Sequence, residues 1–522
     1  MIEFEGINAI ADIPRQQAKL RPNATALWFE GKETSFAELD ARSNQVANAL
    51  IAAGVQPGDR VSYLGKNTDT FYEILFGATK ARAVLASINN RLAAPEMQFI
   101  ANDAQVKVLF VGREFYDIAA IAAETIEGLA AIVAIDGEHD AWPTYAEMIT
   151  AADTDDPNLV NEPSDDVIQL YTSGTTGLPK GVQLTNHNYM SLMRQAADLD
   201  WSAYGPGDAV MNAMPLFHVA GVNIGVLSTM QGAEAVILRD IDPGLILDLI
   251  EKKQIRHAFW VPAVILMMTQ HPKAVDTDFS SLKIVTYGAS PIAETLLVQA
   301  QELMGCQFTQ VYGLTETTGG GTFLPPEAHN PAWGKLRSCG VPYPGTIVRC
   351  VDSEGRSVPT GEVGEIIIKS DFIMKGYWNR PEATEKAVVD DFFYTGDAGY
   401  FDEDGFLFIH DRVKDMIISG GENIYPAEVE NALFAHPEIA DAAVIGVPDE
   451  KWGETVKAII VTKPGTNPSP EDIITFTKDL IAGYKCPKSV DFIEALPRNP
   501  SGKVLRKDLR EKYWGDTDRR VS

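Results

Sequence analysis

The chain has 522 residues, a formal net charge of −28 and 45% apolar residues. This length allows more than one domain with a large core, and the apolar content is that of a globular protein rather than a disordered one. The strong acidity argues against nucleic acid as a partner, because Lys and Arg bind a phosphate backbone.

Cysteine usage and the first residues predict a cytoplasmic protein. The four cysteines form no C-x-x-C pair and have no His at zinc-site spacing, which favours free thiols in a reducing compartment. Residues 1–17 lack the basic and apolar regions of a signal peptide. The uncharged stretch 209–233 is interrupted by Asn, Pro, His and Gln, so we interpret it as buried core and expect no transmembrane segment.

Strand-like and helix-like segments alternate through the first 300 residues, which predicts a layered α/β fold. Ser35 and Glu38 form a capping-box pattern before a helix that ends near Gly54. Asp242 and Pro243 are typical of the N-cap and first turn of a later helix. We expect strands at 60–64, 106–112, 131–136 and 283–290.

The pattern changes twice in the second half of the chain. After about residue 335, short strands such as 365–370 and 405–412 are separated by turns, which predicts a small β-rich lobe. A compact α+β pattern follows from Lys414. We therefore predict a large N-terminal domain of several subdomains over 1–412 and a small α+β C-terminal domain over 413–522. Within the second domain we expect helices from Pro426 and after Pro470 and strands at 442–447 and 456–461.

The segment 171–181, YTSGTTGLPKG, follows an apolar run that reads as the end of a buried strand. Glycine lets the backbone approach a ligand, and consecutive N–H groups in such a turn form a concavity for anions. A solvated surface turn is the alternative, but it rarely combines hydroxyls, glycines and a lysine in this way. We interpret the segment as a phosphate-binding loop made of Thr172, Ser173, Gly174, Thr175, Thr176, Gly177 and Lys180.

This loop differs from the P-loop of many nucleotidases. The P-loop requires G-x-x-x-x-G-K-[ST] at the start of a helix. Here Leu178 and Pro179 separate Gly177 from Lys180, and no G-K-[ST] occurs anywhere in the chain.

Two later segments also follow apolar runs, at the strand ends where ligands bind in open α/β sheets. In the second of them, Tyr312 could stack on a base, Thr315 could bond a phosphate and Glu316 could hold Mg²⁺. In the first, Gly288-Ala289-Ser290, a flat ring could pack on bare backbone. A plain strand-to-turn sequence is the alternative for each segment alone.

Other candidates are weak when taken singly. Asp397 and Arg412 suit ribose hydroxyls, with a surface ion pair as the alternative. Residues 419–423 form either a hairpin turn or a channel for a thin ligand. Lys503 lies in a P-S-G-K turn that alone indicates only an exposed loop, and a lone His such as His218 is more often a core residue than a catalyst.

In combination these segments closely resemble the adenylate-forming superfamily of acyl-CoA synthetases, aryl-CoA ligases, luciferases and adenylation domains. Within it the chain is most similar to bacterial fatty-acid–CoA ligases. The motifs stand in the family's order over residues 171–503: YTSGTTGLPKG, MPLFHVAG (214–221), YGAS (287–290), YGLTE (312–316), MKGYWNRPEAT (374–384), YTGD (394–397), DRVKDMIISGGE (411–422), GVPDEKWGE (446–454) and PSGK (500–503).

The resemblance implies an acid–thiol ligase with two half-reactions. A carboxylate attacks the α-phosphorus of ATP with Mg²⁺ to give acyl-AMP and pyrophosphate, and the thiol of coenzyme A then displaces AMP. It also implies that the C-terminal domain is mobile and turns about a hinge at Lys414 between the two steps.

The motif match further implies a role for each candidate residue. The phosphate loop and Lys180 would bind the β- and γ-phosphates; Gly288, Ala289, Ser290 and Tyr312 the adenine; Thr315 the α-phosphate; Glu316 the Mg²⁺; Asp397 and Arg412 the ribose. Gly313 would belong to the same ATP site. Lys503 would bridge the α-phosphate and the substrate carboxylate. His218, Val219, Gly221, Gly420 and Gly421 would line the acyl site and the thiol tunnel.

The region 214–231 predicts an apolar acid, because it is rich in aliphatic residues and contains no Lys or Arg, and Gly221 and Gly225 are expected to leave space along one face. A medium- or long-chain fatty acid is favoured over an aromatic or sterol-derived acid. The nearest alternative is an acyl-AMP ligase that serves a carrier protein. A homodimer is compatible with the sequence but is not indicated by it.

Overall fold

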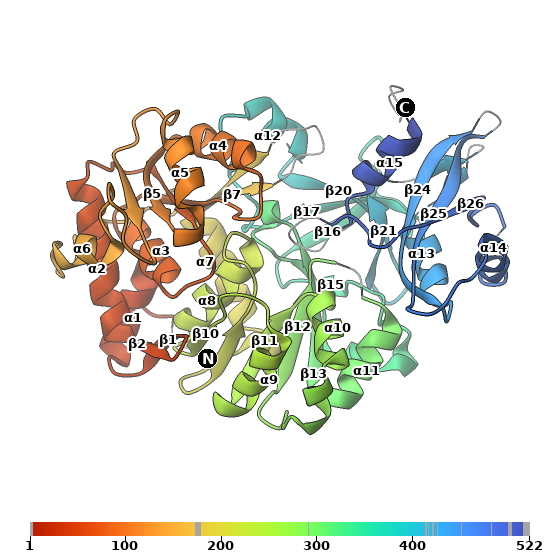
Figure 1. The fold of residues 1–522 in the computed structure, drawn as a ribbon, viewed down its shortest axis with the longest axis horizontal. Helices are drawn as coiled ribbons and strands as arrows, with labels where there is room; N and C mark the ends of the chain where they lie inside the picture. Colours follow the sequence, from red (N-terminus) through yellow and green to blue (C-terminus); the bar gives the residue numbers. More distant parts are fainter. Residues whose placement is uncertain are drawn as a thin grey trace.

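The computed structural model describes residues 4–172, 179–290, 292–412, 415, 417–419, 422–424, 426–449, 452–481, 483–498 and 504–514. These residues form four β-sheets with helices packed around them (Figure 1). The mixed α/β class with a large N-terminal and a smaller C-terminal part is as the sequence predicts.

The first sheet carries the phosphate-loop hairpin near one edge. Its order is β18-β8-β7-β4-β3-β5-β6, with β3 to β7 parallel and with β8 and β18 antiparallel to their neighbours. Its strands are β3 (Arg60–Leu64), β4 (Val84–Ser87), β5 (Val106–Val111), β6 (Ala131–Ala134), β7 (Asp166–Thr172), β8 (Lys180–Thr185) and β18 (Gly376–Tyr377). The helices of this part of the chain are α1 (Asp12–Leu20), α2 (Phe36–Ala52), α3 (Thr70–Lys80), α4 (Ala94–Asp103), α5 (Tyr116–Ala123), α6 (Tyr145–Thr150) and α7 (Asn186–Ala197).

The second sheet has nine strands in the order β15-β14-β13-β12-β11-β9-β10-β1-β2. Its central strands are parallel, so their carboxyl ends share one edge. The strands are β1 (Thr25–Phe29), β2 (Lys32–Ser35), β9 (Ala209–Asn212), β10 (Glu234–Ile237), β11 (Ile255–Trp260), β12 (Ile284–Gly288), β13 (Gln307–Gly313), β14 (Gly321–Leu324) and β15 (Val341–Pro342). The helices are α8 (Val219–Met230), α9 (Pro243–Lys252), α10 (Pro262–Gln270) and α11 (Glu294–Met304).

Two smaller sheets follow in the chain, and the last of them lies at the right of Figure 1. The third sheet contains β16 (Ile347–Val351), β17 (Gly364–Lys369), β19 (Val388–Val389), β20 (Phe392–Phe401) and β21 (Leu407–Arg412), with α12 (Pro381–Ala387) nearby in the chain. The fourth contains β22 (Ile417–Ser419), β23 (Glu422–Ile424), β24 (Ile439–Asp449), β25 (Gly453–Thr462) and β26 (Ser489–Phe492), with α13 (Pro426–Phe434), α14 (Pro470–Lys478) and α15 (Arg506–Trp514).

Local sequence signals explain several of these boundaries. The Ser35 hydroxyl accepts from the Glu38 amide, and the Glu38 carboxylate accepts from the Ser35 amide, so the predicted capping box is confirmed. The Asp242 carboxylate likewise caps α9 by accepting from the Leu245 amide. The predicted strands β3, β5, β6 and β12 are present.

The buried apolar residues fall into separate cores. One large core joins both big sheets and the third sheet, from Ile7 to Leu407. Two small cores lie wholly within residues 417–509. This separation is in keeping with two domains, and the boundary between residues 412 and 413 stays a prediction.

The structure also bears on the cysteines and on membrane-spanning segments. All four cysteines are free, and burial raises the pKa of Cys339 and Cys350 to about 12, so neither is a ready nucleophile. Within the described residues, no helix is both long and apolar enough to cross a bilayer.

Candidate active site

The two ends of the phosphate loop are held next to each other by the β7–β8 hairpin. Thr172 and Lys180 are cross-strand partners in its register. The Nζ of Lys180 lies 4.9 Å from the ring centroid of Tyr377, which belongs to β18 beside β8. The predicted loop residues Ser173, Gly174, Thr175, Thr176 and Gly177 lie outside the described residues.

Glu316 faces this hairpin from the other large sheet. It lies in a short 3₁₀ turn, Thr315–Thr317, which follows the carboxyl end of β13. Its side chain is 8% exposed, and its Oε1 accepts hydrogen bonds from the hydroxyl of Tyr377 at 2.9 Å and of Thr172 at 3.4 Å. The structure therefore brings Thr172 and Glu316 together across 144 residues of chain.

The donor set at Glu316 fits Mg²⁺. This cation keeps several waters and is commonly held by one or two carboxylates together with substrate phosphates. In the part of the chain that the structure describes, no three His, Cys, Asp or Glu side chains form a metal-binding group. A single carboxylate beside the phosphate loop is consistent with that mode of binding.

Tyr312 and Asp397 form a second long-range pair, between β13 and β20. The Tyr312 hydroxyl donates to Oδ2 of Asp397 at 2.9 Å, and the two residues are 8% and 7% exposed. Burial and the neighbouring carboxylate raise the pKa of Tyr312 well above its ordinary value, so the hydroxyl remains a donor. Asp397 is also the register partner of Arg412 in the β20–β21 ladder, so the two predicted ribose residues lie opposite each other.

The adenine candidates surround the ends of β12 and β13. A side chain at Gly288 would overlap the backbone carbonyl of Val311, and one at Gly313 would overlap the carbonyl of Gly319. Close approach of neighbouring backbone therefore already explains why both positions are glycine. Ala289 is exposed and has a left-handed backbone with φ of +67°, and Ser290 is partly buried beside it. Such a strained residue at the end of a sheet strand is typical of a ligand-binding turn.

Val219 is the first residue of α8 and His218 is its N-cap residue. The first turn of this helix lies against residues 318–319, directly after the Glu316 turn. The side chain of Asn223, one turn further along, donates to the Thr318 carbonyl at 2.7 Å. The Nε2 of His218 and the Oδ1 of Asn223 are buried and have no hydrogen-bond partner among the described residues. Burial and the positive charge of Arg91 lower the pKa of His218 to about 4, so its ring is neutral at pH 7.

The prediction that Gly221 and Gly225 leave space along α8 is wrong. A side chain at Gly225 would overlap the ring of Tyr72, and one at Gly221 would overlap the Pro215 carbonyl. The Tyr72 hydroxyl donates to the Gly221 carbonyl at 2.7 Å. Gly225 lets Tyr72 of α3 pack against α8, and Gly221 lets the backbone before α8 approach the helix; a single sequence cannot distinguish such close packing from an open binding face.

Sequence reasoning assigned roles to several residues on which the structure is silent. Lys414, Gly420, Gly421 and Lys503 lie outside the described residues, and only the backbone of Arg412 is described. Their roles remain predictions.

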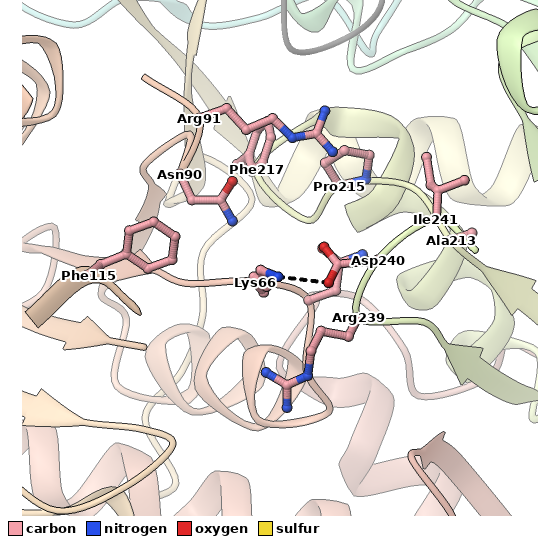
Figure 2. A pocket seen from close by; sticks show the side chains of 11 residues that line it. Lys66, Asn90, Arg91, Phe115, Ala213, Pro215, Phe217, Arg239, Asp240 and Ile241 are labelled. Atoms are coloured by element: carbon pink, nitrogen blue, oxygen red, sulfur yellow. Dashed lines mark hydrogen bonds and ion pairs between the residues drawn. The ribbon is translucent and has the colours of Figure 1, made fainter. Parts of the chain in front are cut away.

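Sequence reasoning also missed a cationic pocket of about 170 Å³ at the carboxyl ends of β3, β4, β9 and β10 (Figure 2). Apolar side chains share its walls with charged and amide side chains, and Lys66 pairs with Asp240 across it at 2.8 Å. The guanidinium of Arg91 lies 5.8 Å from the ring of Phe217, and that ring packs against the ring of His218. The residues that line it are Lys66, Asn67, Asn90, Arg91, Phe115, Ala213, Pro215, Phe217, Arg239, Asp240 and Ile241. The position of Asn90 and Arg91 a few residues after the strand β4 was the available sequence signal.

Comparison with known proteins decides the family. The model of the AMP-binding enzyme family matches residues 14–378, and that of the AMP-binding enzyme C-terminal domain matches residues 428–503. The chain belongs to this adenylate-forming family. As a member of the family it is an ATP-dependent, AMP-forming acid–thiol ligase, which confirms the fold and reaction class predicted from the motifs.

Relatives within the family act on different acids. The chain is 42% identical to a fatty acid–[acyl-carrier-protein] ligase, ScoC, of Streptomyces coeruleorubidus, over 97% of this chain and 96% of the relative. It is 39% identical to a feruloyl-CoA synthase of Amycolatopsis sp, over 96% of this chain and 98% of that one. A solved fatty acyl CoA synthetase of Mycobacterium tuberculosis is 35% identical, with a TM-score of 0.78, and the match covers 98% of this chain and 99% of that one. Family membership alone therefore selects neither the acid nor the thiol.

Proposed function

We propose that this enzyme is an acyl-CoA synthetase that activates a medium- or long-chain fatty acid as acyl-AMP and transfers the acyl group to coenzyme A. The observation that carries the proposal is the meeting of Thr172, Glu316 and Lys180 around Tyr377, because it joins the phosphate loop to a carboxylate suited to Mg²⁺. The Tyr312–Asp397 pair supplies a buried, oriented carboxylate for the ribose.

The first half-reaction requires alignment rather than a general base. Carboxylic acids have a pKa of about 4.3, so the attacking acid is already ionised at neutral pH. Catalysis then consists of aligning the carboxylate with the α-phosphorus and neutralising the charge that develops there. Lys180 would hold the departing pyrophosphate, Thr315 the α-phosphate and Lys503 the junction between phosphate and acid. A bound Mg²⁺ on Glu316 would supply further positive charge.

The second half-reaction would use the same nucleotide site with a different arrangement of the C-terminal domain. Rotation at Lys414 would withdraw Lys503 and bring Gly420 and Gly421 to the thiol's path. The neutral ring of His218 at the start of α8 would not compete with Lys503 for anions, which suits a position beside the acyl site.

The cationic pocket supports coenzyme A as the thiol substrate. Its lining holds three cations, Lys66, Arg91 and Arg239, in a chain with a net charge of −28. Lys66 is paired with Asp240 at 2.8 Å and Arg239 with Glu30 at 2.8 Å, so a bound phosphate would share these two cations with carboxylates. Phosphate groups of a nucleotide are the natural ligands for such a site. Phe217 separates the pocket from His218, so a phosphate bound there would lie one side chain away from the proposed thiol path.

The proposal of an apolar acid rests on the residue types in and around α8. The buried residues of this helix are aliphatic or small, and the stretch 209–233 contains no Asp, Glu, Lys or Arg. An apolar acyl chain therefore meets no unpaired charge there.

A hydroxylated aromatic acid is the second candidate, and one observation favours it. The buried Oδ1 of Asn223 and Nε2 of His218 lack partners among the described residues, and a substrate hydroxyl would satisfy either of them. The feruloyl-CoA synthase relative agrees with this alternative.

The test measures AMP release with a graded series of fatty acids and with hydroxycinnamates, each with and without coenzyme A. We expect the highest kcat/KM for a fatty acid and one acyl-CoA formed per AMP. Preference for a hydroxycinnamate would replace the lipid assignment. Formation of acyl-AMP and pyrophosphate with neither AMP release nor acyl-CoA in the presence of coenzyme A would favour a carrier-protein thiol. In the same assay Arg91→Ala should raise the KM for coenzyme A about tenfold, the loss of one charge-assisted contact, and leave ATP–pyrophosphate exchange unchanged.

A further inference from the structure

Residues 374–380 form a clamp segment between the two halves of the nucleotide site. The Met374 amide donates to the Glu316 carbonyl at 2.8 Å. On the other side, the Lys375 amide donates to the Gln183 carbonyl at 3.0 Å and the Trp378 amide donates to the Gly181 carbonyl at 2.7 Å. One short segment is therefore bonded both to the Glu316 turn and to the strand that follows the phosphate loop.

Tyr377, in the middle of the clamp segment, contacts both charged groups of the site. Its hydroxyl donates to Oε1 of Glu316 at 2.9 Å, and its ring lies 4.9 Å from the ammonium of Lys180. The first contact is a charge-assisted hydrogen bond, and the second is a cation–π interaction. A single partly buried side chain thus sets where the positive and the negative group lie relative to each other.

The residue that follows Tyr377 is anchored away from the site. The guanidinium of Arg60 stacks 3.4 Å from the indole of Trp378, whose Nε1 donates to the Asp103 carbonyl at 2.9 Å. Arg380 pairs with the Asp103 carboxylate at 2.7 Å. These contacts fix the clamp segment against the first sheet. The backbone is therefore anchored both before and after Tyr377, which restricts the position of the Tyr377 ring.

We propose that Tyr377 is a positioning residue for the adenylation half-reaction, one that orients Glu316 toward the metal and Lys180 toward the triphosphate. The hydroxyls of Tyr377 and Thr172 both donate to Oε1, which leaves Oε2 of the carboxylate to a hard cation. The ring holds a long, flexible lysine in place before the nucleotide arrives. Preorganised charge of this kind is effective because it needs no rearrangement during the reaction. This inference rests on the proposed roles of Glu316 and Lys180.

Two substitutions separate the two contacts. Tyr377→Phe removes the hydrogen bond to Glu316 and keeps the ring under Lys180, whereas Tyr377→Leu removes both. Tyr116→Phe is the matched control, because it also deletes a tyrosine hydroxyl that donates to a single partner, the Gly137 carbonyl at 3.2 Å. The thermal midpoint of each variant reports any general loss of folding.

The readouts are the Mg²⁺ concentration that gives half-maximal ATP–pyrophosphate exchange and the Kd of Mg·ATP from calorimetry. Partners of metal-binding side chains typically change metal affinity 10–100-fold, so Tyr377→Phe should raise both values at least about tenfold. It should leave thioester formation from supplied acyl-AMP unchanged, as should Tyr116→Phe. Tyr377→Leu should in addition weaken binding of ATP measured in EDTA.

A double-mutant cycle gives the decisive result. In a Glu316→Gln background, Tyr377→Phe should have no further effect on the Mg²⁺ requirement, because its route to the metal is already lost. Wild-type Mg²⁺ dependence and Mg·ATP affinity in Tyr377→Phe would overturn the inference, as would equal losses in both half-reactions. If the wild-type enzyme forms acyl-AMP but no acyl-CoA, the coenzyme A assignment fails, while the calorimetric result for Tyr377 stands on its own.

Discussion

Tyr312→Phe tests whether the buried pair at β13 and β20 holds the ribose. The substitution removes only the hydroxyl that donates to Asp397 at 2.9 Å and leaves the aromatic ring in place. A hydrogen bond to a charged group contributes about 1.5–3 kcal/mol, and each 1.4 kcal/mol corresponds to about a factor of ten. Since both groups are at least nine-tenths buried, the Asp397 carboxylate is left without this donor and loses its orientation. We expect ATP to bind about 10–100-fold more weakly.

The assay compares the Kd of ATP with that of 2′-deoxy-ATP by calorimetry. If Asp397 binds the ribose hydroxyls, the wild-type enzyme should prefer ATP by about tenfold, and Tyr312→Phe should remove most of that preference. Tyr116→Phe should leave the preference intact. Equal weakening of both nucleotides by Tyr312→Phe would show that the pair supports the fold without reading the ribose, and an unchanged ATP affinity would refute the role of the pair in nucleotide binding.

Three further predictions address the reaction and the stability of the fold. Lys503→Ala should lower the rate of acyl-AMP formation about 10²–10³-fold and spare thioester formation from supplied acyl-AMP; equal loss of both rates would refute its assignment to adenylation. His257 is 6% exposed, and burial lowers its pKa to about 4 from an unfolded value of about 6.5, so protonation favours unfolding. The wild-type thermal midpoint should therefore fall as the pH drops from 6.5 toward 4. His257→Phe should make that fall smaller, because it removes a contribution to the free energy of unfolding of about 3 kcal/mol at most. A pH profile in His257→Phe equal to that of the wild type would contradict the low pKa. Gly225→Ala should cost about 1–3 kcal/mol because the added methyl overlaps Tyr72, whereas Gly483→Ala, where nothing lies within 4 Å, should melt as the wild type does.

Local signals in the sequence predicted much of the fold. The capping box at Ser35 and the N-cap at Asp242 depend on side chains within three residues of each other, so their pattern is visible in the chain itself. The ends of β7, β12 and β13 were likewise marked by apolar runs followed by glycine and hydroxyl residues. Placing Glu316 near the phosphate loop followed from the rule that ligands bind at the carboxyl ends of parallel strands.

Contacts between distant segments could not be predicted in this way. The Tyr312–Asp397 bond spans 85 residues and depends on how the third sheet packs against the second. Tyr377 was visible only as one letter of a motif, because its two contacts come from separate sheets. The prediction of open space at the glycines of α8 was wrong for a related reason. A glycine indicates that some group approaches the backbone closely, but the sequence does not say whether that group is a ligand or a tyrosine.

The closed contact between α3 and α8 has a consequence for how specificity can change in this enzyme. Tyr72 fills the face of α8 at Gly225 and is bonded to the Gly221 carbonyl and to Asn212, so changes there disturb the joint between two sheets before they reshape a binding site. Val219 and Asn223 approach Gly319 from a second face of the same helix, where a substitution would at most remove the hydrogen bond from Asn223 to the Thr318 carbonyl. Laboratory evolution toward a new acid should therefore accumulate its substitutions on that second face of the helix and leave the glycine face untouched.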